Sequence, residues 1–108
     1  MNTLIKFMFK SAVKAIEKKH GKIETLEIEY NGNESRTVTN FIDGRKTVLE
    51  NGHNDKEGSQ YSQMIKDGLG MAVITKLTMS IVPTPFSCTI KGTGFGHEAE
   101  PIEVDTTI

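Results

Sequence analysis

The first twenty residues combine an apolar face and a basic face with the period of an α-helix. Apolar residues recur at intervals of three and four, the spacing that buries one stripe of a helix: Ile5, Met8, Phe9, Ala12, Val13 and Ile16. Asn2 or Thr3 can cap the start, and Gly21 can take the left-handed position after the last turn. The pattern therefore predicts an amphipathic helix over residues 2–20.

The period changes to two after Gly21. Leu26, Ile28 and Tyr30 alternate with polar residues, which is typical of a half-buried strand over residues 22–30 with an acidic outer face. Four glutamates lie on or just after this strand: Glu24, Glu27, Glu29 and Glu34. They can form a solvated face, bind a divalent cation, or meet the basic helix of a second copy in a symmetric dimer.

A hairpin is predicted next. A strand over residues 37–42 is followed by an Asp-Gly dipeptide at 43–44, which is typical of a two-residue type I′ turn, and by a return strand over 45–50. That turn places Val38 opposite Leu49 and leaves both faces of the sheet partly apolar. Both faces then need cover, from this chain or from a second copy.

The second half of the chain is predicted to hold a helix and two strands. Residues 51–58 are polar and glycine-containing, as in an exposed loop, and a helical period then favours a helix over 59–79. The β-branched residues of 72–82 leave a strand as the alternative there. Alternation at Phe86, Cys88 and Ile90, and again at Ile102, Val104 and Thr106, predicts two further strands.

The order α-β-β-β-α-β-β predicts a single α+β domain over residues 1–108, with helices packed on a mainly antiparallel sheet. The chain has 13 basic and 14 acidic residues, so no strong overall charge attracts it to nucleic acid or to a membrane. Its one cysteine, Cys88, fits a buried structural thiol and a reducing compartment. No apolar run is long enough for a membrane span, and we expect a cytoplasmic protein.

The first candidate site is the basic face of the N-terminal helix. Lys6, Lys10, Lys14 and Lys18 follow one another at i, i+4 spacing, and Phe7 projects among them. Like charges at this spacing disfavour an isolated helix, so a partner would explain why they are there. The alternatives are an ordinary solvated face with Phe7 packed under a loop, and a helix lying in the plane of a membrane surface.

The second candidate site is a glycine-rich segment expected to form a loop between the last two strands. Three glycines at alternate positions can let a ligand approach the backbone, and their N–H groups can line an anion pocket with the neighbouring side chains: Lys91, Gly92, Gly94, Phe95, Gly96 and His97. The spacing matches no phosphate-binding fingerprint, and a structural hairpin loop is the alternative.

Signals for enzyme chemistry are few. No pair among His20, His53 and His97 has the spacing of metal ligands, and no serine lies in a nucleophile elbow. The fold could bring His53 or His97 next to a carboxylate as an acid–base pair. We predict no catalytic residues, no metal site and no cofactor, and we leave the enzyme question open while leaning towards a non-enzyme.

These features favour a non-catalytic binding or regulatory protein, such as an inhibitor or accessory factor, that docks onto a protein partner through the basic helix and the glycine-rich segment. A homodimer is a further expectation. One alternative is a nucleic-acid-binding protein whose lysines contact phosphates while Phe7 stacks on a base. The other is a small-anion or nucleotide-binding protein that uses the glycine-rich segment.

Overall fold

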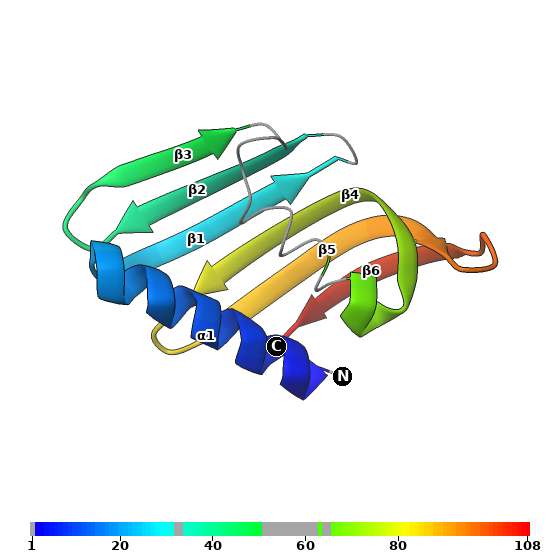
Figure 1. Ribbon diagram of the computed structural model, residues 1–108, viewed down its shortest axis with the longest axis horizontal. Coiled ribbons are helices and arrows are strands. Elements are labelled where there is room, and N and C mark those ends of the chain that lie inside the picture. The colour runs from blue at the N-terminus through cyan, green and yellow to red at the C-terminus, as the bar shows by residue number, and fades with distance from the viewer. Residues whose placement is uncertain (1, 32–33, 51–62, 64–65) are drawn as a thin grey trace.

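The computed structural model describes residues 2–31, 34–50, 63 and 66–108. One long helix precedes six strands (Figure 1), with these bounds: α1 Asn2–His20, β1 Ile23–Tyr30, β2 Ser35–Phe41, β3 Lys46–Glu50, β4 Met71–Val82, β5 Ser87–Gly96 and β6 Pro101–Thr107. A second helical segment, which includes residues 66–69, lies between β3 and β4.

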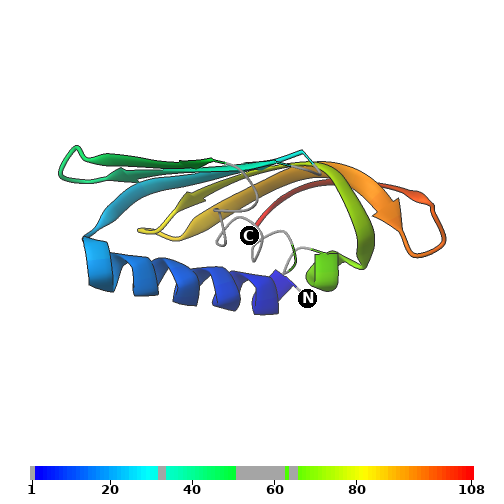
Figure 2. The same ribbon diagram turned by 45° about the horizontal axis from the view of Figure 1, so that its top comes forward.

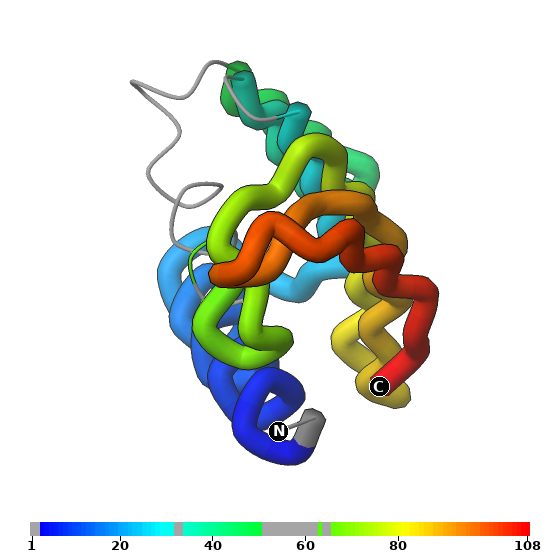
Figure 3. The backbone as a smooth tube through the Cα atoms, turned by 90° about the vertical axis from the view of Figure 1, so that its right-hand side faces the viewer, coloured from blue at the N-terminus to red at the C-terminus, as the bar shows by residue number. Residues whose placement is uncertain are grey.

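All six strands belong to one antiparallel sheet with the order β3-β2-β1-β4-β5-β6, so β3 and β6 form its edges. Figure 2 shows that α1 and residues 66–69 lie on the same side of the sheet, and the end view in Figure 3 agrees. We call this the inner face of the sheet and the opposite one the outer face. The predicted α+β class with a mainly antiparallel sheet is confirmed.

The core lies between α1 and the inner face. Ile5, Phe9 and Val13 of α1 are buried there, as the helical period predicts. They join a cluster contributed by every strand except the two edges: Ile23, Leu26, Ile28, Phe41, Met71, Ile74, Leu77, Met79, Ile81, Cys88 and Ile90. The cluster fixes the helix on the sheet and decides which face of α1 stays outside.

The end of α1 is tied to the sheet by polar contacts. Gly21 has a φ of 112°, which favours glycine, and its N–H donates to the Glu17 carbonyl, so the predicted helix end is confirmed. The Glu17 carboxylate accepts a hydrogen bond of 2.9 Å from the N–H of Ile23. Arg45, from the hairpin between β2 and β3, donates to the carbonyl oxygen of His20 at 2.6 Å. Helix, first strand and hairpin thus meet at one junction.

The predicted helix over 59–79 is wrong in its second half. Residues 71–82 form strand β4, and one strand is therefore added to the predicted order. The inward positions Leu77, Met79 and Ile81 alternate along β4 and pair with β1 and β5 on both sides. Pairing with two neighbours decides in favour of the strand where local propensity is ambiguous. The predicted loop over 51–58 and most of the first half of that helix lie outside the described residues.

The predicted register of the β2–β3 hairpin is shifted by one residue. Val38 lies opposite Val48, not opposite Leu49, because the connection is longer than a two-residue turn. Phe41 N–H donates to the Arg45 carbonyl, and Gly44 adopts a φ of 93° at the end of a three-residue loop. A slip of one residue exchanges the faces, so both valines lie on the outer face.

Candidate functional site

The outward face of α1 is the surface on which most of the predicted partner-binding residues lie. Counted at about 100° per residue, the basic and large apolar side chains within an arc of about 120° opposite the buried stripe are Leu4, Phe7, Lys10, Lys14 and Lys18. All five are exposed. We call these five residues the α1 patch.

Lys6 lies outside this patch, although the spacing grouped it with the other lysines. Each i, i+4 step advances a side chain by about 40° around the helix, so four such lysines follow a curve and not a straight line. Lys6 is accordingly half-buried at the border of the apolar stripe. The Lys10 ammonium lies 5.5 Å from the centre of the Phe86 ring, which holds it towards the turn between β4 and β5.

The apolar part of the α1 patch lies at its N-terminal end. Phe7 is 66% exposed and Leu4, one turn earlier, is 59% exposed. Leu4 was not among the predicted contact residues, although Phe7 was. The signal was present, because a three-residue separation places two helical side chains side by side. Together they present an exposed apolar surface beside the lysines of the α1 patch.

The lysines of the α1 patch form no salt bridge with any residue that the structure describes. Among the residues that the structure describes, salt bridges join Arg36 to Glu50 and Arg45 to Asp43, and none involves a lysine of α1. The Arg45 backbone N–H donates to the Asp43 carboxylate and, with the guanidinium, lowers the pKa of that carboxyl below its usual value. Lys10, Lys14 and Lys18 are thus exposed and form no salt bridge with the described part of the chain.

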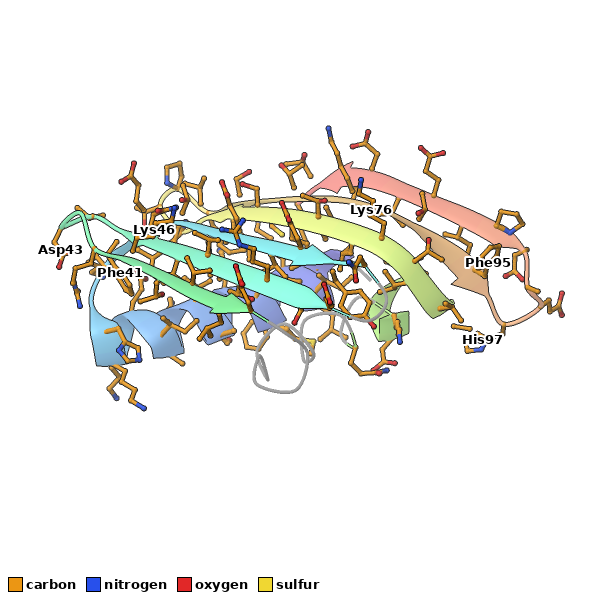
Figure 4. All side chains as sticks on the ribbon, turned by 90° about the horizontal axis from the view of Figure 1, so that it is seen from above. Phe41, Asp43, Lys46, Lys76, Phe95 and His97 are labelled. Carbon is orange, nitrogen blue, oxygen red and sulfur yellow. The ribbon has the colours of Figure 1, made fainter. Side chains whose placement is uncertain are left out.

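The predicted glycine-rich loop is wrong, because residues 91–96 belong to strand β5. This strand is paired on both sides, with β4 and with β6, so its backbone takes part in ladders. The side chains of Lys91 and Phe95 lie on the outer face, whereas Gly92 and Gly94 occupy inner-face positions opposite Leu77 and Ile74. The turn that follows β5 begins at His97, at the end of the sheet far from Asp43 (Figure 4).

The glycines of β5 are required by the packing of the strand, because the backbone of β4 lies close to Gly92 and Gly94. Strand β4 bulges at two places next to them, between Met71 and Val73 and between Ile74 and Lys76. Each bulge brings a β4 carbonyl oxygen close to β5, so that a Cβ at Gly94 would overlap the Val73 oxygen. Glycine within a strand pattern indicates this kind of close approach.

The outer face of the sheet carries charges that alternate between strands. One cross-strand row, from edge to edge, consists of Glu50, Arg36, Glu29, Thr78, Lys91 and Asp105. Arg36 Nε lies 3.3 Å from Glu50 Oε1, and the register places Lys91 opposite Asp105. Opposite charges that face each other across strands attract, so the charges of this row largely compensate one another.

The predicted dimer between the basic helix and the acidic strand does not fit this arrangement. Glu27 and Glu29 alternate with the buried Leu26 and Ile28, so they lie on the outer face. Helix α1 lies on the other side of the sheet (Figure 2). Contact between opposite sides of two copies is head-to-tail, and repeating it gives a ring or an open filament, not a two-fold dimer. A two-fold dimer needs a surface that meets its own copy.

The described residues offer little for catalysis. His20 ends α1 and His97 lies in the turn after β5, while His53, Asp55 and Glu57 fall outside the described residues. Within the described ranges, no three His, Cys, Asp or Glu side chains gather into a group that could hold a metal ion. A hollow of about 550 Å³ at the end of the β1–β2 hairpin is lined by charges of both signs, including Glu29, Glu34, Arg36, Glu50 and Lys76.

Cys88 is fully buried in β5, which confirms the prediction of a structural thiol. Burial raises its pKa to about 12. In the unfolded chain the thiol ionises near pH ~8.5, so at higher pH the unfolded state loses a proton that the folded state keeps.

We therefore expect Cys88 to make the free energy of unfolding fall by about 1.4 kcal/mol per pH unit between about pH 9 and pH 12. Below that window its contribution is constant. Urea titrations of the wild type and Cys88→Ala at several pH values measure it, because the stability gap between the two proteins must narrow as pH rises. A gap that stays constant to about pH 11 would contradict the protonated, buried thiol.

Over the described ranges, no helix combines the length and the apolar content that crossing a membrane requires. Comparison with protein-family models, with curated proteins and with solved structures gives no match. Functional inference therefore depends on the surfaces described above.

Proposed function

We propose that this chain is a non-catalytic, cytoplasmic binding protein of the inhibitor or accessory-factor type, and that it docks onto an acidic protein partner through the α1 patch. The observation that carries the proposal is the exposure of Phe7 and Leu4 beside lysines that form no salt bridge with the described residues. Large apolar side chains one turn apart are the usual anchors of a helix that enters an apolar groove.

Charge defines the partner. Residues 2–20 contain five lysines and one glutamate. Such a helix attracts an acidic surface and increases the rate of encounter with it. Aromatic anchors then supply much of the binding energy once water is excluded around them. The partner is therefore expected to present an apolar groove with carboxylates at its rim.

A photo-crosslinking experiment tests the α1 patch directly. We expect a photoreactive phenylalanine analogue at position 7 to form a discrete protein adduct in the source cell. The same analogue at position 42 is the matched control, because Ile42 is also 66% exposed but lies in the β2–β3 turn. Adducts equal at both positions, or absent at position 7, would overturn the proposal.

The charge part of the proposal has its own test. We expect Lys10→Glu with Lys14→Glu to reduce the position 7 adduct by at least about tenfold, since two favourable contacts become repulsive. Circular dichroism should show unchanged folding, because both side chains are exposed and the Lys10–Phe86 contact is worth only about 0.5–1 kcal/mol. An adduct yield that resists both substitutions would mean that charge does not recruit the partner.

The salt dependence of oligonucleotide binding distinguishes the nucleic-acid alternative from a protein partner. If the lysines bind phosphates and Phe7 stacks on a base, a single-stranded oligonucleotide will be retained at low salt and released steeply as salt rises. Retention of that kind, together with nuclease-sensitive adducts, would replace the protein partner with nucleic acid. The small-anion alternative stays a prediction that no contact within the described structure favours.

A further inference from the structure

Strand β3 leaves one edge of the sheet open. It pairs with β2 on one side, and it has no neighbouring strand on the other side among the residues that the structure describes. All five of its residues, from Lys46 to Glu50, are exposed, including Val48 at 41% and Leu49 at 43%. An open edge presents unpaired N–H and C=O groups that can pair with another strand.

The pairing with β2 shows which backbone groups point outward. The N–H of Phe41 donates to the carbonyl of Arg45, so residue 45 directs its carbonyl towards β2. In an antiparallel ladder the direction of the backbone N–H and C=O groups alternates from residue to residue. Those of residues 47 and 49 therefore also point towards β2. The N–H and C=O groups of Lys46, Val48 and Glu50 therefore point away from the sheet.

The outward-pointing residues are complementary to their own reversed copy. In an antiparallel pair centred on Val48, that residue meets Val48 of the second copy. Lys46 then lies opposite Glu50 of the second copy, and Glu50 lies opposite Lys46 of the second copy. Each of these three pairs exchanges two backbone hydrogen bonds, and the two outer pairs join opposite charges on the same face.

The other edge of the sheet does not have this property. Strand β6 begins with Pro101, which has no N–H, and its outer-face charges are Glu103 and Asp105. Pairing β6 with its own reversed copy about Val104 would place these two carboxylates opposite each other. Proline and repelling charges are the usual protection of an edge strand, and β3 lacks both.

We infer that β3 pairs with β3 of a second copy across a two-fold axis at Val48, forming one continuous sheet of two chains. The axis is perpendicular to the sheet, because directly opposed residues of an antiparallel pair point to the same face. Both α1 helices then lie on the same side of the joined sheet. The pairing uses none of the α1 patch, so the inference stands apart from the proposed function.

Charge exchange tests the pairing in solution. Sedimentation velocity of the wild type should show a species of about twice the 12.0 kDa chain mass. Lys46→Glu alone and Glu50→Lys alone place like charges opposite each other at both ends, and each should weaken the dimer by about tenfold. The double variant Lys46→Glu/Glu50→Lys should restore it. A wild-type monomer, or a double variant no better than the single ones, would overturn the inference.

Disulfide trapping tests the register. In Val48→Cys the two-fold places equivalent α-carbons about 5.5 Å apart, within disulfide range, so mild oxidation should give a covalent dimer. Lys46→Cys is the matched control, since it lies on the same exposed strand but more than about 13 Å from its counterpart. The native Cys88 is buried and stays unreactive in both. Equal cross-linking of the two variants would indicate random collision and would exclude this register.

Discussion

Replacing Phe9 with alanine is expected to lower the free energy of unfolding by about 3–5 kcal/mol. Phe9 is fully buried where α1 meets the inner face of the sheet, so truncation loses the transfer free energy of the ring and leaves a cavity. A loss of this size is a large share of the roughly 5–15 kcal/mol that a small domain has in total. Urea unfolding followed by far-UV circular dichroism measures it.

Phe7→Ala is the matched control for that experiment. Phe7 lies on the same helix, two residues earlier, but is 66% exposed. Its replacement should change the free energy of unfolding by less than about 0.5 kcal/mol, because exposed substitutions away from special contacts are nearly neutral. Similar losses for both variants would mean that α1 packs with a different face against the sheet. The pair also separates stability from binding, since only Phe7 belongs to the α1 patch.

Replacing Gly94 with alanine is expected to lower the free energy of unfolding by about 3 kcal/mol or more. The added Cβ would overlap the carbonyl oxygen of Val73 and approach the Met71 side chain, and a backbone oxygen cannot move aside by changing a rotamer. The paired strands β4 and β5 would have to separate at the bulge. Chemical denaturation, followed as for Phe9→Ala, measures the loss.

Gly44→Ala distinguishes this effect from the general cost of losing a glycine. Nothing lies within 4 Å of the position that a Cβ would take at Gly44. The strain of an alanine there would come mainly from the φ of 93°, which favours glycine. That strain should cost about 1–2 kcal/mol. If Gly94→Ala is no more destabilising than Gly44→Ala, the close approach of the two strands at this bulge is contradicted.

Local signals in the sequence were sufficient for α1. Its apolar period, its glycine end and the outward direction of Phe7 all depend on neighbours within a few residues, and the structure shows each of them. The lysine spacing, taken as a straight stripe, placed Lys6 wrongly because a helix turn is not four residues long. The position of Lys6 could therefore have been predicted from the sequence alone, by counting about 100° per residue.

Other features depend on partners that are distant along the chain. Residues 71–82 satisfy a helical and a strand period, and only pairing with β1 and β5 decides between them. The alternating glycines of β5 have the same ambiguity, because a flexible loop and a strand beside a bulge both require small residues. Likewise, the charge symmetry of residues 46–50 has no meaning until the strand order places β3 at an edge.

The arrangement of α1 beneath the sheet separates charge within a chain whose total charge is only −1. With five lysines and one glutamate, the helix is strongly positive, and the rest of the chain carries the compensating negative charge. The molecule therefore has an electric dipole moment despite its near-neutrality. An acidic macromolecule at a distance exerts a torque on such a dipole, and the protein rotates so that α1 arrives first.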